Sequence, residues 1–238
     1  MSGKLLTTLR YDVTDRTATI TLDRPAARNA LSTAMRSELP ATMARADDDR
    51  DVDVVILTGA DPAFCAGLDL AELASGDHAV AATALSSEQP PSPRRPFEPI
   101  SKPVIAAVNG PAVTGGFELA LHCDFIVASE RARFADTHSR VGIQPGWGLT
   151  AMLSAAVGVR RARELSGTGN FLDAATAHAW GLVNHVVPHE ELLPFCRRLG
   201  ADICSNDQAA VHHVLGTYRL QSSAANEAAL EIESRRGW

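Results

Sequence analysis

The order of apolar and polar residues predicts several β-strands in the first 130 residues. Residues 5–13 and 17–22 alternate between the two kinds around the pair Asp15 and Arg16, a pattern typical of a β-hairpin. Apolar runs without polar interruption predict further, buried strands at residues 52–58, 104–108 and 125–128. The chain therefore supplies enough strands for a sheet with both faces covered.

Helices are expected between these strands and along most of the remaining chain. Ser32 is a good N-terminal cap for a helix that ends near Ala46, and a second helix is expected over residues 117–122. Beyond residue 150 the pattern predicts alanine-rich helices at 150–157, 160–166 and 173–180, a short strand at 183–187, and three more helices over 189–236. Strands and helices in this succession indicate a layered α/β fold.

Residues 75–101 interrupt the order. Within them, residues 88–96 carry four prolines and few side chains suited to a core. A loop of this length inside a compact domain is more often functional than not, so we expect a mobile lid or wall of a pocket, with plain disorder as the alternative.

Composition and charge narrow the class of protein. The chain has 238 residues, of which 45% are hydrophobic and 21% charged, which suits one sizeable globular core. Its net charge of −6 leaves no basic face for wrapping nucleic acid. We find no apolar run of the roughly 18 residues that span a bilayer, and no signal-peptide layout after Met1, so a cytoplasmic protein without membrane partners is expected.

The four cysteines predict neither a disulfide framework nor a metal site. Cys65, Cys123, Cys196 and Cys204 show no CxxC or other metal-ligand spacing, and a reducing compartment would keep them as thiols. The chain also contains neither a phosphate loop nor a dinucleotide fingerprint. No metal and no separate cofactor are expected.

Two distant segments combine glycine or other small residues with a turn. They are Phe64-Cys65-Ala66-Gly67-Leu68-Asp69 and the stretch from Asn109 to Glu118 that contains Gly115-Gly116. A plausible helix follows each turn, so free backbone N–H groups and the positive end of a helix dipole would point at one anionic atom. This pairing predicts an oxyanion hole, and the enolate oxygen of a thioester fits such a site.

These segments belong to six ordered strings that together resemble the crotonase superfamily, the enoyl-CoA hydratase/isomerase fold. The strings are DRPAARNALS (23–32), DVDVVILTG (51–59), FCAGLDL (64–70), KPVIAAVNGPAVTGGFELALHCDFIVAS (102–129), RFADTHSRVGIQPGWG (133–148) and AWGLVNHVV (179–187). The resemblance implies a ββα spiral core over residues 1–188. It also implies a C-terminal helical region over 189–238 that covers the pocket and assembles a homotrimer or a dimer of trimers.

The resemblance assigns roles to three positions of the predicted hole. The backbone N–H groups of Leu68 and Gly115 would be the oxyanion donors, and Glu118 would hold water and act as general base. Two purely structural interpretations of these residues stay open. The glycine turns would then solve only a packing problem, and Glu118 would only satisfy amides at the start of a helix.

The family's second glutamate falls on His138 in this chain, within FADTH at 134–138. An imidazole gives or takes a proton near neutrality, but its reach and charge differ from those of a carboxylic acid. Asp136 would orient this ring if an extended segment put both side chains on one face. The alternatives are a partly buried histidine bonded to a backbone carbonyl and a surface aspartate.

Further positions would border coenzyme A by resemblance. Ala27, Arg28 and Ala66 would lie along the adenine, and Leu68 to Ala71, including Asp69 and Leu70, along the pantetheine arm. Arg24, Arg28, Arg94 and Arg95 are candidates for its phosphates, with solvated surface arginines as the alternative. Trp147 would limit the acyl group or fill the core, and Cys65 as a nucleophile is the weakest candidate.

The sequence thus favours a lyase of the enoyl-CoA hydratase type that adds water to a 2-enoyl-CoA in fatty acid metabolism. Enoyl-CoA isomerisation is the first alternative, because it can proceed with one base and the chain retains one glutamate. A hydrolase or decarboxylase of another acyl-CoA is a further alternative, and a noncatalytic acyl-CoA-binding subunit belongs to a different class.

Overall fold

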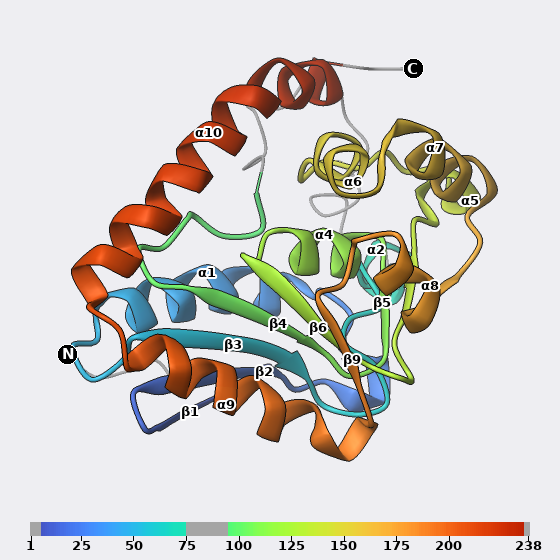
Figure 1. Cartoon of the computed structure of the whole chain (residues 1–238). Helices are drawn as coiled ribbons and strands as arrows, with labels where there is room; N and C mark the ends of the chain where they lie inside the picture. The colour runs from blue at the N-terminus through green and yellow to red at the C-terminus, as the bar shows by residue number, and fades with distance from the viewer. Residues whose placement is uncertain (1–5, 75–94, 236–238) are drawn as a thin grey trace.

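The computed structural model describes residues 6–74 and 95–235 of the chain (Figure 1). The predicted lid or wall at 75–101 falls largely on residues 75–94, which lie outside the described residues. The first half contains β1 (Leu9–Thr14), β2 (Thr17–Leu22), the 3-10 helix η1 (Pro25–Ala27), α1 (Thr33–Asp48), β3 (Val54–Gly59), α2 (Leu70–Ala74), β4 (Val104–Val108), β5 (Pro111–Val113), α4 (Gly115–Leu121) and β6 (Phe125–Ser129).

The second half is largely helical. It contains β7 (Arg133–Ala135), α5 (His138–Val141), α6 (Leu149–Val157), α7 (Val159–Thr168), β8 (Leu172–Asp173), α8 (Ala174–Ala179), β9 (His185–Val187), the 3-10 helix η2 (His189–Glu191), α9 (Leu192–Cys204) and α10 (Gln208–Arg235). Where the pattern predicts three helices after residue 188, the structure forms one short 3-10 helix and two α-helices. A division of the chain at residue 188 stays a prediction.

A mixed sheet of six strands forms the centre, in the order β1-β2-β3-β4-β6-β9 (Figure 1). The strands β1 and β2 pair antiparallel, as the hairpin predicted, and the other neighbours pair parallel. Asp15 and Arg16 make the tight turn with φ of 49° and 61°. A second sheet of three strands has the order β5-β7-β8.

Alternate residues of the central strands face two different apolar clusters. Val55, Leu57, Ala106 and Ile126 belong to the larger cluster, which includes residues of α1 and α4. Val54, Ile56, Ile105, Ala107 and Val127 belong to the smaller one, together with Leu192 and Cys196 of α9. Because helices cover both faces, every residue of β3 and β4 is buried, which explains their unbroken apolar runs.

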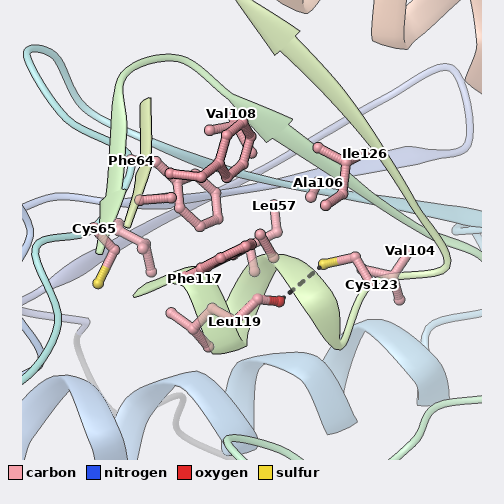
Figure 2. Packing of buried hydrophobic residues seen from close by; sticks show 14 of the residues in the cluster. Leu57, Phe64, Cys65, Val104, Ala106, Val108, Phe117, Leu119, Cys123 and Ile126 are labelled. Atoms are coloured by element: carbon pink, nitrogen blue, oxygen red, sulfur yellow. Dashed lines mark hydrogen bonds between the residues drawn. The ribbon is translucent and has the colours of Figure 1, made fainter. Parts of the chain in front are cut away.

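The helix α4 is buried in the larger cluster. Figure 2 shows Phe117 and Leu119 of α4 among strand residues such as Leu57 and Ala106. The rings of Phe117 and Phe134 lie 5.4 Å apart, which ties α4 to β7 of the small sheet. The helix begins at Gly115, two residues earlier than the pattern predicts, so Glu118 lies in its first turn.

The long helix α10 lies apart from the sheet, as Figure 1 shows. Arg219 holds the first half of α10 to the core through an ion pair with Asp124 and a hydrogen bond to the carbonyl of Lys102. A groove of about 1000 Å³ separates it from the core and is lined by Phe97 and Leu230, among others. Within the described ranges, no helix is long and apolar enough to cross a membrane.

Candidate active site

The two glycine turns predicted from the sequence lie side by side. Cys65 and Ala112 form an isolated parallel bridge, and the Val113 N–H donates to the Cys65 carbonyl at 2.9 Å. Gly67 has φ of +89°, and a Cβ placed on it would overlap the hydroxyl oxygen of Thr114. The backbones therefore approach as closely as they do because position 67 has no side chain.

Two amide donors stay uncommitted where these turns meet. Gly115 is the first residue of α4, where an N–H has no acceptor inside the helix, and Leu68 follows Gly67 in the other turn. In the part of the chain that the structure describes, neither N–H donates to another backbone group. The Cα of Gly67 lies only 3.8 Å from the point that a Cβ of Gly115 would occupy. The predicted pair of donors is thus brought to one place.

Backbone strain and a small pocket mark the same place. Thr114 adopts φ of 48°, a positive value that a β-branched residue rarely adopts and that often accompanies a functional site. A pocket of about 50 Å³ opens beside the turns, and its wall includes Ala66, Leu68, Thr114 and His138.

Glu118 is 3% exposed and reaches this region from the first turn of α4. Its Oε1 accepts the Trp147 N–H at 2.8 Å. Burial raises the pKa of Glu118 from its ordinary 4.5 to about 7, although the charge of His138 and the Trp147 amide act against this shift. A carboxyl with this pKa exchanges a proton readily at neutral pH.

The imidazole ring of His138 lies between the carboxyl groups of Glu118 and Asp136, and a hydrogen bond to Asp136 orients it. The Nε2 of His138 lies 3.9 Å from Glu118 Oε2, and its Nδ1 lies 2.6 Å from Asp136 Oδ1. Burial alone would raise the pKa of Asp136, but hydrogen bonds from His138 and Ser166 hold it below its ordinary value. An ionised Asp136 accepts a hydrogen bond from Nδ1–H, which leaves Nε2 facing Glu118.

Asp136 contacts His138, as expected, but the two residues do not lie on one face of an extended segment. Only residues 133–135 are extended, and His138 begins the short helix α5. Asp136 lies in the connecting turn and also accepts the His138 backbone N–H at 3.2 Å. The two side chains therefore meet through an Asx-type turn and not through the alternation of a strand.

The positions expected to border coenzyme A lie in or near the glycine turn at residues 64–70. The Ala66 N–H donates to the Arg28 carbonyl at 3.0 Å, which joins the Ala27-Arg28 turn to the motif at 64–70. Leu70 is exposed, at 53%, and begins α2 together with Ala71. The Asp69 side chain is occupied instead, because its carboxylate caps α2 and pairs with Arg24 at 2.8 Å.

Arg24 thus has a partner, which weakens it as a phosphate ligand, whereas Arg28 is exposed. Arg94 lies outside the described residues, and Arg95 donates to Ser223 Oγ beside the large groove. Burial raises the pKa of the Cys65 thiol to about 12, which disfavours the nucleophile interpretation. Among the described residues, no group of three or more His, Cys, Asp or Glu side chains could hold a metal ion.

Trp147 contributes more than the sequence indicated. Its ring carbon Cζ3 lies 3.5 Å from the Cβ position of Gly115, its N–H holds Glu118, and its carbonyl lies 2.6 Å from His122 Nε2. From the sequence, only the indole of this residue is a candidate for a role in the pocket. The signal for the amide was the flanking Gly146 and Gly148 before a helical run, since such a turn presents free N–H groups.

Comparisons with known proteins agree with the fold. The family model described as enoyl-CoA hydratase/isomerase matches residues 13–236. The chain is 42% identical over 197 residues to a probable peroxisomal enoyl-CoA hydratase 1 of Arabidopsis thaliana, which covers 82% of this chain and 71% of that protein. It is 38% identical to a crotonyl-CoA hydratase of Syntrophomonas wolfei, covering 90% and 79%.

A solved structure of an enoyl-CoA hydratase from Mycobacterium tuberculosis superposes with a TM-score of 0.87 at 48% identity, covering 96% of each chain. The chain belongs to the enoyl-CoA hydratase/isomerase family and has the crotonase fold. It is an enzyme of that family, which sets aside the noncatalytic alternative.

Proposed function

We propose that the protein adds water across the C=C bond of a 2-enoyl-CoA thioester, with Glu118 and His138 as its acid–base pair. The observation that carries this proposal is the approach of His138 Nε2 to within 3.9 Å of Glu118 Oε2, beside two uncommitted amides. Hydration needs one group that takes a proton from water and one that gives a proton to Cα. This pair can do both.

The amides of Leu68 and Gly115 would bind the thioester oxygen. That oxygen becomes negative when water attacks Cβ, and fixed N–H donors stabilise it without reorganisation. The start of α4 adds its dipole at the same point.

Glu118 and His138 would carry the two proton transfers of hydration, with Asp136 in support. The Glu118 carboxylate takes a proton as the water oxygen bonds to Cβ, and the protonated His138 gives a proton to Cα as the enolate collapses. The proton on Glu118 then passes to His138 Nε2, which restores both groups. Asp136 keeps the other ring nitrogen protonated throughout, since it lies 2.6 Å from Nδ1.

Turnover of crotonyl-CoA by the purified protein tests the proposal, through loss of the conjugated-thioester absorbance. Glu118→Gln keeps an acceptor for the Trp147 amide but removes the base, so we expect the rate to fall on the order of 10²–10⁴-fold. Glu227→Gln, an exposed position on α10, is the matched control and should leave the rate unchanged. Absence of hydration with 2-enoyl-CoA substrates of any chain length would contradict the proposal.

Isomerisation of 3-enoyl-CoA is the second candidate, because Glu118 is the carboxylate paired with His138 Nε2 among the residues that the structure describes, and one base can move a proton from Cα to Cγ. Formation of a conjugated product from 3-enoyl-CoA, with no hydration of crotonyl-CoA, would favour it. A hydrolase or decarboxylase would instead release free coenzyme A or carbon dioxide.

Substrate binding, assembly and location complete the proposal. Ala27, Arg28, Ala66 and Leu70 would contact the coenzyme A moiety, which enters as part of the substrate; the hydrogen bond from the Ala66 amide to the Arg28 carbonyl, which joins their two turns, supports this assignment. A homotrimer or dimer of trimers is supported by apolar side chains that α10 exposes, among them Tyr218 and Leu220. A cytoplasmic location stays a prediction from the sequence.

A further inference from the structure

The first turn of α6 has no side-chain cap of its own. Gly148 precedes the helix with φ of +91°, and no side chain from the turn itself bonds the free amides. A helix start of this kind leaves N–H groups that need acceptors from elsewhere.

Two carboxylates from distant parts of the chain supply these acceptors. Glu118 of α4 accepts the Trp147 amide at 2.8 Å and also a hydrogen bond from the Leu149 amide. Glu233 of α10 accepts the Gly148 amide at 2.7 Å and the Thr150 amide at 2.9 Å. Four consecutive amides are thus divided alternately between the two acids.

Further contacts strengthen the attachment of Glu233 to the first turn of α6. The Thr150 hydroxyl also donates to Glu233 Oε2. Leu230, three residues earlier on α10 and therefore on the same helix face, places its Cδ2 2.6 Å from the point that a Cβ of Gly148 would occupy. The last turns of α10 therefore contact the start of α6, and Figure 1 shows these two elements next to each other.

We infer that Glu233 is a positioning residue: it fixes the turn at 147–150 so that the Trp147 and Leu149 amides converge on Glu118. Because each peptide unit is planar, an acceptor that holds the amides of Gly148 and Thr150 restricts the orientation of the Leu149 amide between them and of the Trp147 amide directly before them. The C-terminal helix would by this route set the geometry of the acid–base pair without touching substrate. The inference rests on the proposed function for its catalytic consequence, but not for the geometry.

The geometric part can be measured without turnover. The chain contains three tryptophans, so ¹⁵N-tryptophan labelling gives three backbone amide signals, and Trp147→Phe identifies the one that belongs to Trp147. In Glu233→Ala we expect this signal to shift and its hydrogen exchange to accelerate. In Glu227→Ala, which removes an exposed acid from the same helix, it should stay in place.

The catalytic part is measured with crotonyl-CoA. Glu233→Ala should lower kcat by about 10- to 100-fold, as expected when a reacting group is misplaced by up to an ångström, with a much smaller change in KM. Glu233→Gln retains one acceptor oxygen, so it should fold if Glu233→Ala does not, and its loss of kcat should be smaller. Glu227→Ala should match the wild type.

The outcomes separate the two proposals. An unmoved Trp147 signal in both Glu233 variants, or a moved signal with unchanged kcat, would overturn the role of Glu233. A wild-type protein that hydrates no enoyl-CoA, while Glu233→Ala still moves the Trp147 signal, would overturn the hydratase proposal and leave the positioning of Glu118 intact.

Discussion

At the scale of single residues, Glu118 shows how the site exchanges stability for reactivity. A carboxyl that is 3% exposed would have to ionise without most of its hydration, so burial raises its pKa to about 7. Asp136 has the opposite balance, because its hydrogen bonds outweigh its burial. The two acids on either side of His138 therefore differ in proton affinity, which is what an acid–base pair and its support require.

The raised pKa of Glu118 predicts a stability that depends on pH. The folded state binds more protons than the unfolded state between pH 4.5 and about 7, so the Glu118 contribution to the free energy of unfolding falls as pH rises through this window. Relative to wild type, Glu118→Gln should gain about 2–3 kcal/mol between pH 5 and pH 8. Denaturant unfolding at both pH values measures the difference, and Glu227→Gln should show none.

Asp136→Asn tests the support of His138. The amide keeps the shape of the side chain but loses the charge that holds Nδ1–H, so we expect kcat to fall by at least about tenfold, within the range that acid–base groups contribute. KM for crotonyl-CoA should change much less. Asp12→Asn, at an exposed position of β1, is the control, and equal kcat in the two variants would contradict the role.

At the scale of elements, the close contact of α4 with the turn at 65–67 positions the predicted oxyanion donors. Gly116 lies inside α4, where a Cβ would overlap the carbonyl oxygen of Cys65. That oxygen is fixed by the Val113 N–H, so it cannot give way cheaply. The position of the Gly115 amide therefore depends on a neighbour that has no side chain.

This contact predicts opposite effects for two glycine-to-alanine changes. Gly216→Ala, in α10 with nothing within 4 Å of the added Cβ, should stabilise the protein by up to about 1 kcal/mol through helix propensity. Gly116→Ala should instead destabilise by about 1–3 kcal/mol and lower kcat, because it forces α4 away from the turn. Thermal unfolding compares them, and a stabilising Gly116→Ala would disprove the close approach.

Local signals explain which elements could be predicted from the sequence. Ser32 accepts the Met35 amide and starts α1, and the Asp15-Arg16 turn joins β1 to β2, because each depends on neighbours in the chain. Glu118 followed from its place in a motif and His138 from the resemblance. The partners Trp147 and Glu233 could not be predicted, since they lie 29 and 115 residues beyond Glu118 and no local pattern encodes such contacts.

At the scale of the whole molecule, α10 leaves several large apolar side chains exposed. Val214, Tyr218, Leu220 and Ile232 are each at least half exposed, Leu220 at 74%. Tyr218 and Leu220 also line the groove of about 1000 Å³ between this helix and the core, so a second subunit that covered α10 would remove these apolar side chains from water.

Self-association can be tested by sedimentation. We expect a species of three or six times the 25.3 kDa chain mass. A double change of Tyr218→Glu and Leu220→Glu places charge at two exposed positions of α10 and should shift the distribution toward the single chain, with little change in helical content by circular dichroism. A wild-type protein that sediments as one chain at micromolar concentration would contradict the proposed assembly.

The burial of the cysteines has a practical consequence. Cys65, Cys123 and Cys196 are enclosed in the core, whereas Cys204, at the end of α9, is partly accessible. A maleimide dye should therefore attach first at Cys204, four residues before α10 begins. The unmodified chain thus offers a ready attachment point for fluorescence reporters of movement in its final helix, without engineering new thiols.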